Sequence, residues 1–398
     1  MNTHKALEDI RVLDLTRVVA GPYSTMILAD LGAEVIKLEI PDKGDDTRNY
    51  APYKNGSSMY FANINRNKKS ITLNLKTEEG REIFRKLVKK VDVIVENFRP
   101  GVMDKLGLGY EDLKKINDQI IYAAVSGFGS YGPYSQRPGY DILAQAMGGL
   151  MSLTGYPELP PMRAGNAMGD VLGGLNLTIG ILGALHARNI TGAGQMVDVA
   201  LVDSVVSSLD SATQRYFENG EIPQRIGNRY APCAPYDVFH ARDTEMIIAC
   251  GNQGLYEKLC ALMKRIDLIT DERFAIMEDR VKNNAELKII IEDWLSHYTA
   301  KEATDLILKA GIPAGPVYNL KEVSEDEHIA DYREMFVEMV HPEIGPMRVN
   351  GCVIKLSDTK PEVKVPAPLL GEHNLYVYED ILGMSDDDLA KLKQQKVI

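Results

Sequence analysis

The chain has 398 residues, of which 45% are hydrophobic and 25% charged, and its formal net charge at pH 7 is −11. This composition is ordinary for a globular protein, and the length allows about two to three domains. The acidic excess argues against nucleic acid as the main partner, because recognition of a phosphate backbone requires clustered Lys and Arg.

The sequence also lacks the patterns of membrane insertion, secretion and metal binding. No uninterrupted apolar run reaches the roughly 18 to 20 residues of a membrane span, and residues 1–9 contain no apolar stretch of the secretory type. The four cysteines form no Cys-x-x-Cys pair, and the seven histidines form no His-x-x-x-His pair. We therefore expect a cytoplasmic protein with reduced thiols, no bound metal and no membrane partner.

The first 218 residues alternate between short apolar strands and helices, which predicts a doubly wound parallel sheet. Residues 141–155 and 171–190 are longer, apolar and rich in glycine, which favours closely packed helices. The predicted strands cover 10–15, 34–38, 92–96, 120–125 and the start of 195–210, and the predicted helices cover 23–31, 78–90, 110–116 and the end of 195–210.

A second, smaller unit is predicted after a break at 219–235, where Gly, Pro and Asn cluster. Residues 236–249 alternate like a hairpin, and three helical patterns follow at 255–264, 284–298 and 301–310. Residues 338–368 read as extended and 385–395 as a helix. The expected organisation is a Rossmann-like large α/β domain at 1–218, a linker at 219–235, a small α+β domain at 236–330, a return linker at 331–368, and a C-terminal segment at 369–398 that packs back on the large domain.

The common cofactor and hydrolase motifs are absent from the chain. The turn after the first predicted strand reads TRVVAGP at 16–22, so it lacks the Gly-x-Gly-x-x-Gly fingerprint of a dinucleotide site. No Gly-x-Ser-x-Gly elbow and no Walker loop occur elsewhere. A dehydrogenase or an α/β-hydrolase is therefore disfavoured.

A series of local strings, in this order along nearly the whole chain, resembles the class III CoA-transferases, the family of formyl-CoA and succinyl-CoA transferases and their racemase relatives. The resemblance implies an α/β enzyme that takes acyl-CoA and small carboxylic acids as substrates, with no permanently bound cofactor. The strings are VLDLTRVVAGP at 12–22, LGAEVIKLE at 31–39, NKKSITLNLKTEEG at 67–80, DVIVENFRPG at 92–101, SGFGSYGP at 126–133, GYDILAQAMGGLMSLTG at 139–155, GDVLGG at 169–174, GQMVDVAL at 194–201, GIPAGPV at 311–317 and PLLGEHN at 368–374.

Asp170 is the nucleophile that the resemblance implies, since it is the Asp of the family's Gly-Asp pair. An ionised carboxylate attacks a thioester carbonyl without a general base and gives a mixed anhydride and CoA thiolate. The thiolate then forms an aspartyl-CoA thioester, and the acceptor acid reverses these steps. An unperturbed Asp pKa of about 3.9 predicts that the group is charged at neutral pH. Local sequence alone favours another interpretation, a helix N-cap, and the two roles are compatible.

The resemblance also assigns a mobile glycine loop to Gly251, Asn252, Gln253 and Gly254, which would shield the anhydride from water. An ordinary turn after a strand explains this segment equally well. For CoA, the basic and aromatic candidates suit phosphate oxygens and adenine, although each basic one is individually more typical of a solvated surface charge. The CoA candidates are Arg17, Val19, Lys68, Lys69, Asn97, Phe98, Arg99, Lys105 and Arg137.

Tyr140 separates transfer from racemisation, because the family's racemases carry His-Asp where this chain has Tyr140-Asp141. Racemisation needs a proton shuttle on each face of the α-carbon, and His titrates near neutrality whereas Tyr does not. The racemases also place a Glu near Asn252, which cannot exchange protons. The alternatives kept open are a 2-methylacyl-CoA-type racemase and a non-catalytic CoA-binding protein.

The acids themselves stay open at the level of sequence. Formyl-CoA transferases carry Gln where Val19 stands and Trp around Tyr50, which puts the oxalate and formate pair in doubt. Oxalate, short dicarboxylic, 2-hydroxy and aryl acids are all compatible with the chain. The resemblance further implies an intertwined homodimer, in which each chain forms a ring threaded through its partner and the active site lies between domains of different chains.

Overall fold

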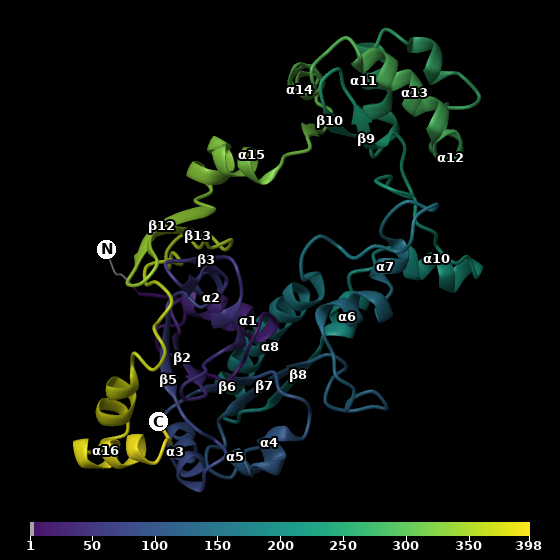
Figure 1. The fold of residues 1–398 in the computed structure, drawn as a ribbon. Coiled ribbons are helices and arrows are strands. Elements are labelled where there is room, and N and C mark those ends of the chain that lie inside the picture. Colours follow the sequence, from purple (N-terminus) through teal and green to yellow (C-terminus); the bar gives the residue numbers. More distant parts are fainter. Residues whose placement is uncertain (1–3) are drawn as a thin grey trace. The chain divides into compact units, whose positions relative to one another are not determined.

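A computed structural model describes residues 4–398, which divide into two compact units (Figure 1). The first unit comprises the residues up to Met151 together with Arg163–Gln214 and Glu327–Ile398. The second comprises Ser152–Met162 and Arg215–Asp326. Three separate stretches of chain therefore build the first unit, and two build the second.

The first unit is built on a six-stranded sheet in which every pairing is parallel. Its order is β5-β2-β1-β6-β7-β8, the 3-2-1-4-5-6 order of doubly wound dinucleotide-binding folds. The prediction of an α/β fold with a parallel sheet is confirmed. The strands are β1 (Arg11–Asp14), β2 (Glu34–Glu39), β5 (Lys68–Thr72), β6 (Val93–Glu96), β7 (Ile121–Ser126) and β8 (Met196–Ala200).

Helices cover both faces of this sheet, and each face has its own apolar core. One core packs α1 and the long α8 against residues such as Val12 and Val95, and the other packs α3 and the C-terminal residues against Leu13 and Ile94. The helices of this unit are α1 (Ala20–Asp30), α2 (Met59–Ile64), α3 (Glu78–Val88), α4 (Val102–Lys105), α5 (Tyr110–Leu113), α6 (Asp141–Met147), α8 (Met168–Thr191), α9 (Leu201–Val206) and α16 (Asp386–Gln394).

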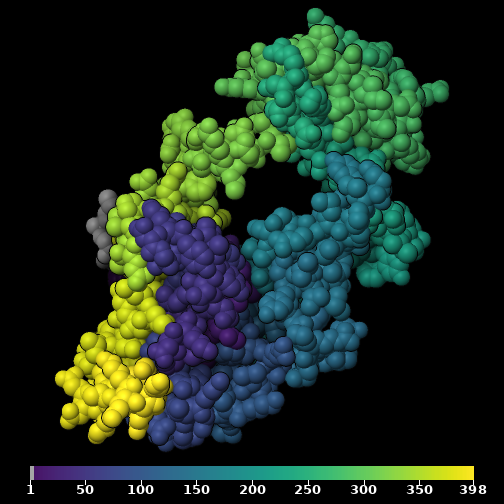
Figure 2. Space-filling model, viewed as in Figure 1, coloured from purple at the N-terminus to yellow at the C-terminus, as the bar shows by residue number. Residues whose placement is uncertain are grey.

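The C-terminal part of the chain returns to the first unit. Tyr378 and Leu389 are buried in the same core as Phe84 of α3, and Figure 2 shows the last residues, in yellow, against the blue surface of the α3 region. Within the stretch 338–368, which we expected to be extended, β12 (Phe336–His341) and β13 (Gly345–Asn350) form an antiparallel hairpin. The Pro-rich composition concealed this hairpin, whose second strand begins directly after the turn with Gly345 at a φ of 75°.

The second unit is a small α+β structure. Its sheet has the order β11-β10-β9, and the antiparallel pairing of β9 with β10 confirms the predicted hairpin. Residues 152–162 belong to this unit because Arg225 donates hydrogen bonds to the carbonyls of Tyr156 and Leu159. The elements are β9 (Tyr236–His240), β10 (Glu245–Ala249), β11 (Ala314–Pro316), α11 (Gln253–Leu262), α12 (Met277–Lys282), α13 (Asn284–Leu295), α14 (Ala300–Lys309) and α15 (Leu320–Glu325). Two further helices, α7 (Leu150–Leu153) and α10 (Ala212–Asn219), lie where the units divide.

Helix α8 is long and apolar enough to cross a membrane when judged by length and composition alone. An 18-residue window within it has a mean hydropathy of 1.5, and 44% of that window is buried. The core helix of a soluble protein has the same length and composition, so this single helix is weak evidence for a membrane span. In the first unit α8 packs on α1, β7 and β8.

A network of buried charges lies beneath the carboxyl end of the sheet. Lys37 forms an ion pair of 2.8 Å with Asp45, and Lys68 forms one of 3.0 Å with Asp14. Although burial opposes ionisation, Lys68 and Lys37 hold the pKa of Asp14 well below its usual range. Lys37 also donates to the carbonyl of Thr16 at 2.8 Å. These contacts fix the turn that follows β1.

Candidate functional site

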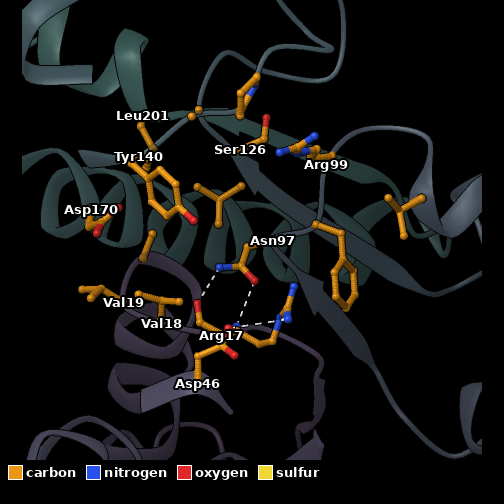
Figure 3. Close-up of a pocket in the computed structure, with 17 residues that line it drawn as sticks. Arg17, Val18, Val19, Asp46, Asn97, Arg99, Ser126, Tyr140, Asp170 and Leu201 are labelled. Carbon is orange, nitrogen blue, oxygen red and sulfur yellow. Dashed lines mark hydrogen bonds and ion pairs between the residues drawn. The ribbon is translucent and has the colours of Figure 1, made fainter. Parts of the chain in front are cut away.

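A pocket of about 450 Å³ opens at the carboxyl end of the sheet, where the strand order reverses between β1 and β6 (Figure 3). Open α/β sheets bind ligands at this position. The loops after β1 and β6, the last residue of β7 and the first turn of α8 contribute Arg17, Asn97, Ser126 and Asp170 respectively to its walls. One concave site therefore collects residues from four separate parts of the first unit.

Asp170 is the third residue of α8, and its half-buried side chain lines the pocket. Burial, and then the negative charge of Asp141, raise the pKa of Asp170 to about 7. The expectation of an unperturbed carboxyl, fully ionised at neutral pH, is therefore wrong. The ionised form of Asp170 is therefore less favoured at neutral pH than that of an ordinary aspartate.

The start of α8 also corrects the interpretation of Asp170 as an N-cap. The helix begins at Met168, and its N-cap residue Ala167 provides no side-chain hydrogen bond. Instead, Asp141 from α6 accepts hydrogen bonds from the backbone N–H of Gly169 at 2.7 Å and of Asp170 at 3.4 Å. A Cβ on Gly169 would lie 3.1 Å from the Asp141 Oδ1 atom. The carboxylate that caps α8 therefore comes from another helix, and Asp170 is left facing the pocket.

Tyr140 lines the Asp170 end of the pocket, and Tyr60 lies close enough to interact with the Asp170 charge. Tyr140 is 70% exposed, and Figure 3 shows its ring beside Asp170. Burial, and then the negative charge of Asp170, raise the pKa of Tyr60. The rings of Tyr50 and Tyr60 meet edge to face at 5.8 Å. With buried Val19, these rings give the acid an environment of phenols and aliphatic surface.

The other end of the pocket is basic. Arg17 donates its backbone N–H to Asn97 Oδ1 at 2.9 Å, and Asn97 Nδ2 donates to the Arg17 carbonyl at 2.7 Å. The Arg17 guanidinium lies 5.3 Å from the Phe98 ring and 3.6 Å from Asp46. Arg99 is exposed and lines the same pocket. Five of the predicted CoA residues, Arg17, Val19, Asn97, Phe98 and Arg99, are thus brought together.

A second pocket, of about 390 Å³, adjoins the first and shares Arg17, Phe98 and Val102 with it. Its walls are mainly apolar, and two exposed lysines, Lys43 and Lys76, lie at its border. The apolar wall residues are Leu15, Leu38, Ile40, Leu73, Leu75, Phe98 and Leu106. Sequence reasoning had not selected either of these lysines.

The remaining predicted CoA residues line neither pocket. Lys68 is buried, and its ammonium donates to Asp14 and to the carbonyl of Pro22, both at 3.0 Å. Lys69 is bound to Glu34 at 2.9 Å. Lys105 is exposed on α4, and the exposed Arg137 lies 3.6 Å from the Tyr134 ring. The positions of Lys68 and Lys69 do not support phosphate contacts, because their donors serve other groups.

The predicted glycine loop lies in the second unit, where it connects β10 to α11. Asn252 is the N-cap of α11, and its Oδ1 atom accepts a hydrogen bond from Leu255 N at 3.0 Å. Gln253 donates to Glu257 at 3.1 Å. Nothing lies within 4 Å of a Cβ placed on Gly251. The segment is thus a helix start with an open glycine, and its role in shielding an intermediate stays a prediction.

Sequence reasoning missed Asp46, Tyr60, Ser126 and Gln145, and it gave Asp141 no role of its own. The sequence does allow a contact between Asp141 and Gln145 to be predicted, since they are polar residues four positions apart in an apolar helical run, DILAQAM. Gln145 is fully buried and donates to Asp141 at 2.8 Å. The others lie far from Asp170 in the sequence, so only the fold places them at this pocket.

Comparison with known proteins gives concordant results. The model of CoA-transferase family III matches residues 7–374. The chain is 44% identical over 367 residues to an acetyl-CoA:oxalate CoA-transferase of Acetobacter aceti, covering 92% of this chain and 93% of that protein. It is 37% identical over 396 residues to a succinyl-CoA–D-citramalate CoA-transferase of Chloroflexus aurantiacus, covering 99% and 98%. The crystal structure of a CaiB/BaiF family protein from Brucella suis matches with a TM-score of 0.83 and 39% identity, covering 95% of this chain and 99% of that one.

Proposed function

The chain belongs to CoA-transferase family III, and we propose that it moves CoA from a short acyl-CoA donor to a dicarboxylic acid through intermediates on Asp170. One observation carries the choice of nucleophile. Asp170 is the carboxylate of the first turn of α8, and it lines a pocket that is basic at its other end. Such a site suits a reacting thioester at one end and the phosphates of CoA at the other.

The proposed reaction has four balanced steps. The Asp170 carboxylate adds to the thioester carbonyl, and the C–S bond breaks. CoA leaves as the thiolate, and the acyl group stays on Asp170 as a mixed anhydride. The thiolate attacks the aspartyl carbonyl, which gives aspartyl-CoA and releases the donor acid. The acceptor carboxylate then attacks aspartyl-CoA, and the thiolate attacks the acceptor's carbonyl in the new anhydride. Asp170 is regenerated and no ATP is consumed, because each intermediate is itself an activated acyl group.

We propose that CoA spans both pockets of the first unit. Adenine would lie in the apolar second pocket against Phe98, with phosphates near Lys43, Lys76 and Arg17 at its border. The pantetheine arm would then pass Val18 and Asn97 toward Asp170 in the first pocket. The three residues that line both pockets support one continuous ligand.

The acceptor class rests on the two relatives named above. The acceptors in the names of these relatives, oxalate and D-citramalate, are both dicarboxylic acids, and the donors are acetyl-CoA and succinyl-CoA. Val19 and the tyrosines around Asp170 give a less polar wall than a Gln would, which suits the carbon skeleton of an acid longer than oxalate. We therefore propose a short dicarboxylic acceptor with more than two carbons.

A transfer assay tests this function directly. The protein is incubated with acetyl-CoA or succinyl-CoA and single acids (oxalate, citramalate, glutarate, acetate, lactate) without ATP, and acyl-CoA products are separated by liquid chromatography and mass spectrometry. We expect a new dicarboxylyl-CoA formed in equal amount to the donor consumed. In deuterium oxide, label entering the α-carbon of a 2-methylacyl-CoA without a new thioester would indicate a racemase. Binding of acyl-CoA without turnover on any acid would contradict catalysis.

We further propose the homodimer that the resemblance implies. Ile179 of α8 is 66% exposed, and it lies on an apolar helix of which less than half is buried. Leu175 on the same helix and Ile142, Leu143 and Met147 on α6 are also exposed. Apolar patches of this kind on a soluble protein mark interaction surfaces. A second copy of the chain is the proposed occupant.

The substitution Ile179→Asp should therefore disrupt assembly. A charged side chain at a buried interface leaves an unpaired carboxylate, so we expect monomer or aggregate in place of the dimer. Size-exclusion chromatography with light scattering measures the change. Ile289→Asp is the matched control, because Ile289 is 68% exposed on α13 of the second unit and should leave the dimer intact. A wild-type protein that dilutes to monomers, or an Ile179→Asp dimer as stable as wild type, would contradict this proposal.

A further inference from the structure

Gln145 is a fully buried amide in the core between α6 and α8, with an exposed fraction of 0%. A buried amide is unfavourable unless its hydrogen-bonding groups are satisfied. An apolar side chain of the same size would fill this space without that requirement. The contacts of the amide therefore indicate what it does.

The Gln145 side chain forms hydrogen bonds with Asp141 and with the segment that leads into Asp170. Its Nε2 donates to Asp141 Oδ2 at 2.8 Å and to the carbonyl of Asn166 at 3.3 Å. Its Oε1 accepts from the N–H of Ala164 at 2.9 Å. The other oxygen of Asp141 accepts from the backbone of Gly169 and Asp170. One side chain thus ties together the capping carboxylate and the loop before α8.

An amide supplies both the donor and the acceptor that this set of contacts requires. The Asp141 carboxylate needs a donor, and the Ala164 N–H needs an acceptor on the same side chain. A Glu at this position would turn an oxygen toward the Asp141 oxygen, and a Met would offer neither group. The first turn of α8 has no side-chain cap from its own N-cap residue, so its position depends on Asp141.

We propose that Gln145 is a positioning residue that acts on the nucleophile through Asp141 and the 164–166 loop. The inference rests on the function proposed for Asp170. The amide fixes both supports of the first helical turn, so the Asp170 carboxylate is held at one place relative to the thioester. A displacement of about 1 Å at a reacting group lowers rates by about 100-fold.

The charged and titratable groups around Asp170 determine how a change at Gln145 affects the proton affinity of Asp170. Asp141 from α6 faces it from behind the pocket, and Tyr60 from α2 lies close enough to feel its charge. Arg17, Asp46 and Arg99 line the same pocket from the loops after β1, β2 and β6. In Gln145→Glu a third carboxylate beside Asp141 would raise the proton affinity of this cluster by its charge alone. The fall in kcat at nearly unchanged KM is therefore the readout that separates positioning from a merely structural role.

Steady-state kinetics of Gln145→Met and Gln145→Glu test the proposal. We expect kcat of the Met variant to fall about 10- to 100-fold, with KM for acyl-CoA within about threefold of wild type. In the Glu variant, the acidic limb of the pH profile of kcat/KM should shift to higher pH by about one unit. Thr178→Val is the control, since Thr178 is buried on α8 but bonds Ser24 and Gly174 instead. Its kcat and acidic limb should match wild type.

The outcomes separate this inference from the function on which it rests. Wild-type kcat in a folded Gln145→Met variant would overturn the inference, while an inactive Asp170→Asn would leave the function standing. An active Asp170→Asn would instead remove the proposed nucleophile. If the Met variant does not fold, Ala164→Pro deletes the N–H that Gln145 accepts and leaves the core filled. Its kcat should fall about 10-fold, and a wild-type kcat would count against positioning.

Discussion

Asp170→Asn is expected to abolish CoA transfer, with kcat lowered by about 10⁴-fold or more. The amide keeps the size of the side chain but cannot form the mixed anhydride, so the reaction loses its covalent route. The measurement is the rate of new acyl-CoA formation under saturating donor and acceptor. Asp203→Asn, which changes an exposed carboxylate in the first turn of α9, should stay within about twofold of wild type.

Chemical trapping tests Asp170 as the nucleophile without a measurement of turnover. Hydroxylamine added with acyl-CoA should convert the activated carboxyl of the wild-type protein to a hydroxamate on the peptide containing Asp170. The Asn variant should give no such peptide. A hydroxamate at another residue, or full activity in the Asn variant, would show that the nucleophile lies elsewhere.

The pH dependence of the wild-type enzyme follows from the environment of this carboxyl. Burial and Asp141 raise the pKa of Asp170 to about 7, and the ionised form is the nucleophile, so kcat/KM should rise with pH through about 7. A raised folded-state pKa means that the contribution of Asp170 to stability is present below the unfolded pKa of about 4 and is lost as the pH rises through about 7. Asp170→Asn should therefore be more stable than wild type at pH 8.5, and this difference should vanish near pH 4.

Lys37→Met is the substitution expected to affect folding most. The Lys37 side chain is 0% exposed, and its ammonium binds Asp45 and the Thr16 carbonyl, both at 2.8 Å. Burial opposes its charge, but Asp45, Asp14 and Glu39 raise the pKa of Lys37 overall. Methionine would leave buried carboxylates without this partner, so we expect a loss of about 3–5 kcal/mol in the free energy of unfolding.

Chemical denaturation followed by circular dichroism measures this loss. Lys69→Met is the matched control, because Lys69 is on the neighbouring strand β5 and pairs with Glu34 while its side chain is 34% exposed. This pair is partly exposed, and Glu34 keeps Arg11 at 2.5 Å as a second partner, so we expect a loss of at most about 1 kcal/mol. The double variant Lys37→Met/Asp45→Asn should recover part of the loss, since the unpaired charge is removed. Equal effects of Lys37→Met and Lys69→Met would contradict the role of the buried network.

Much of the architecture was predictable from pattern alone. The strands at 10–15, 34–38, 92–96 and 120–125 differ from the observed strands by one or two residues at their ends, because buried parallel strands are continuous apolar runs. The hairpin at 336–350 was not predicted, since its composition is Pro-rich and its apolar residues pack on α2 from far away in the sequence. Helix α8 was recognised as apolar, but its start was placed three residues late.

The CoA residues illustrate why basic side chains are hard to assign from sequence. Lys68, Lys69 and Lys76 lie in one family-like string at 67–80. Lys68 is buried against Asp14, whereas Lys76 borders the second pocket. A lysine next to a carboxylate and a lysine free to bind phosphate look the same in a sequence. Burial and ion pairing, which depend on distant residues, separate them.

The sequence by itself determined the α/β class and the family, and it singled out Asp170 as the nucleophile to propose, because strand and helix periods and the order of family strings are local properties of the chain. The tertiary structure decided the chemical state of that residue. Asp141 is 29 positions away along the chain, yet it bonds the N–H of Asp170 at 3.4 Å. Burial and this second carboxylate raise the pKa of Asp170 to about 7, and neither effect exists until the two helices pack.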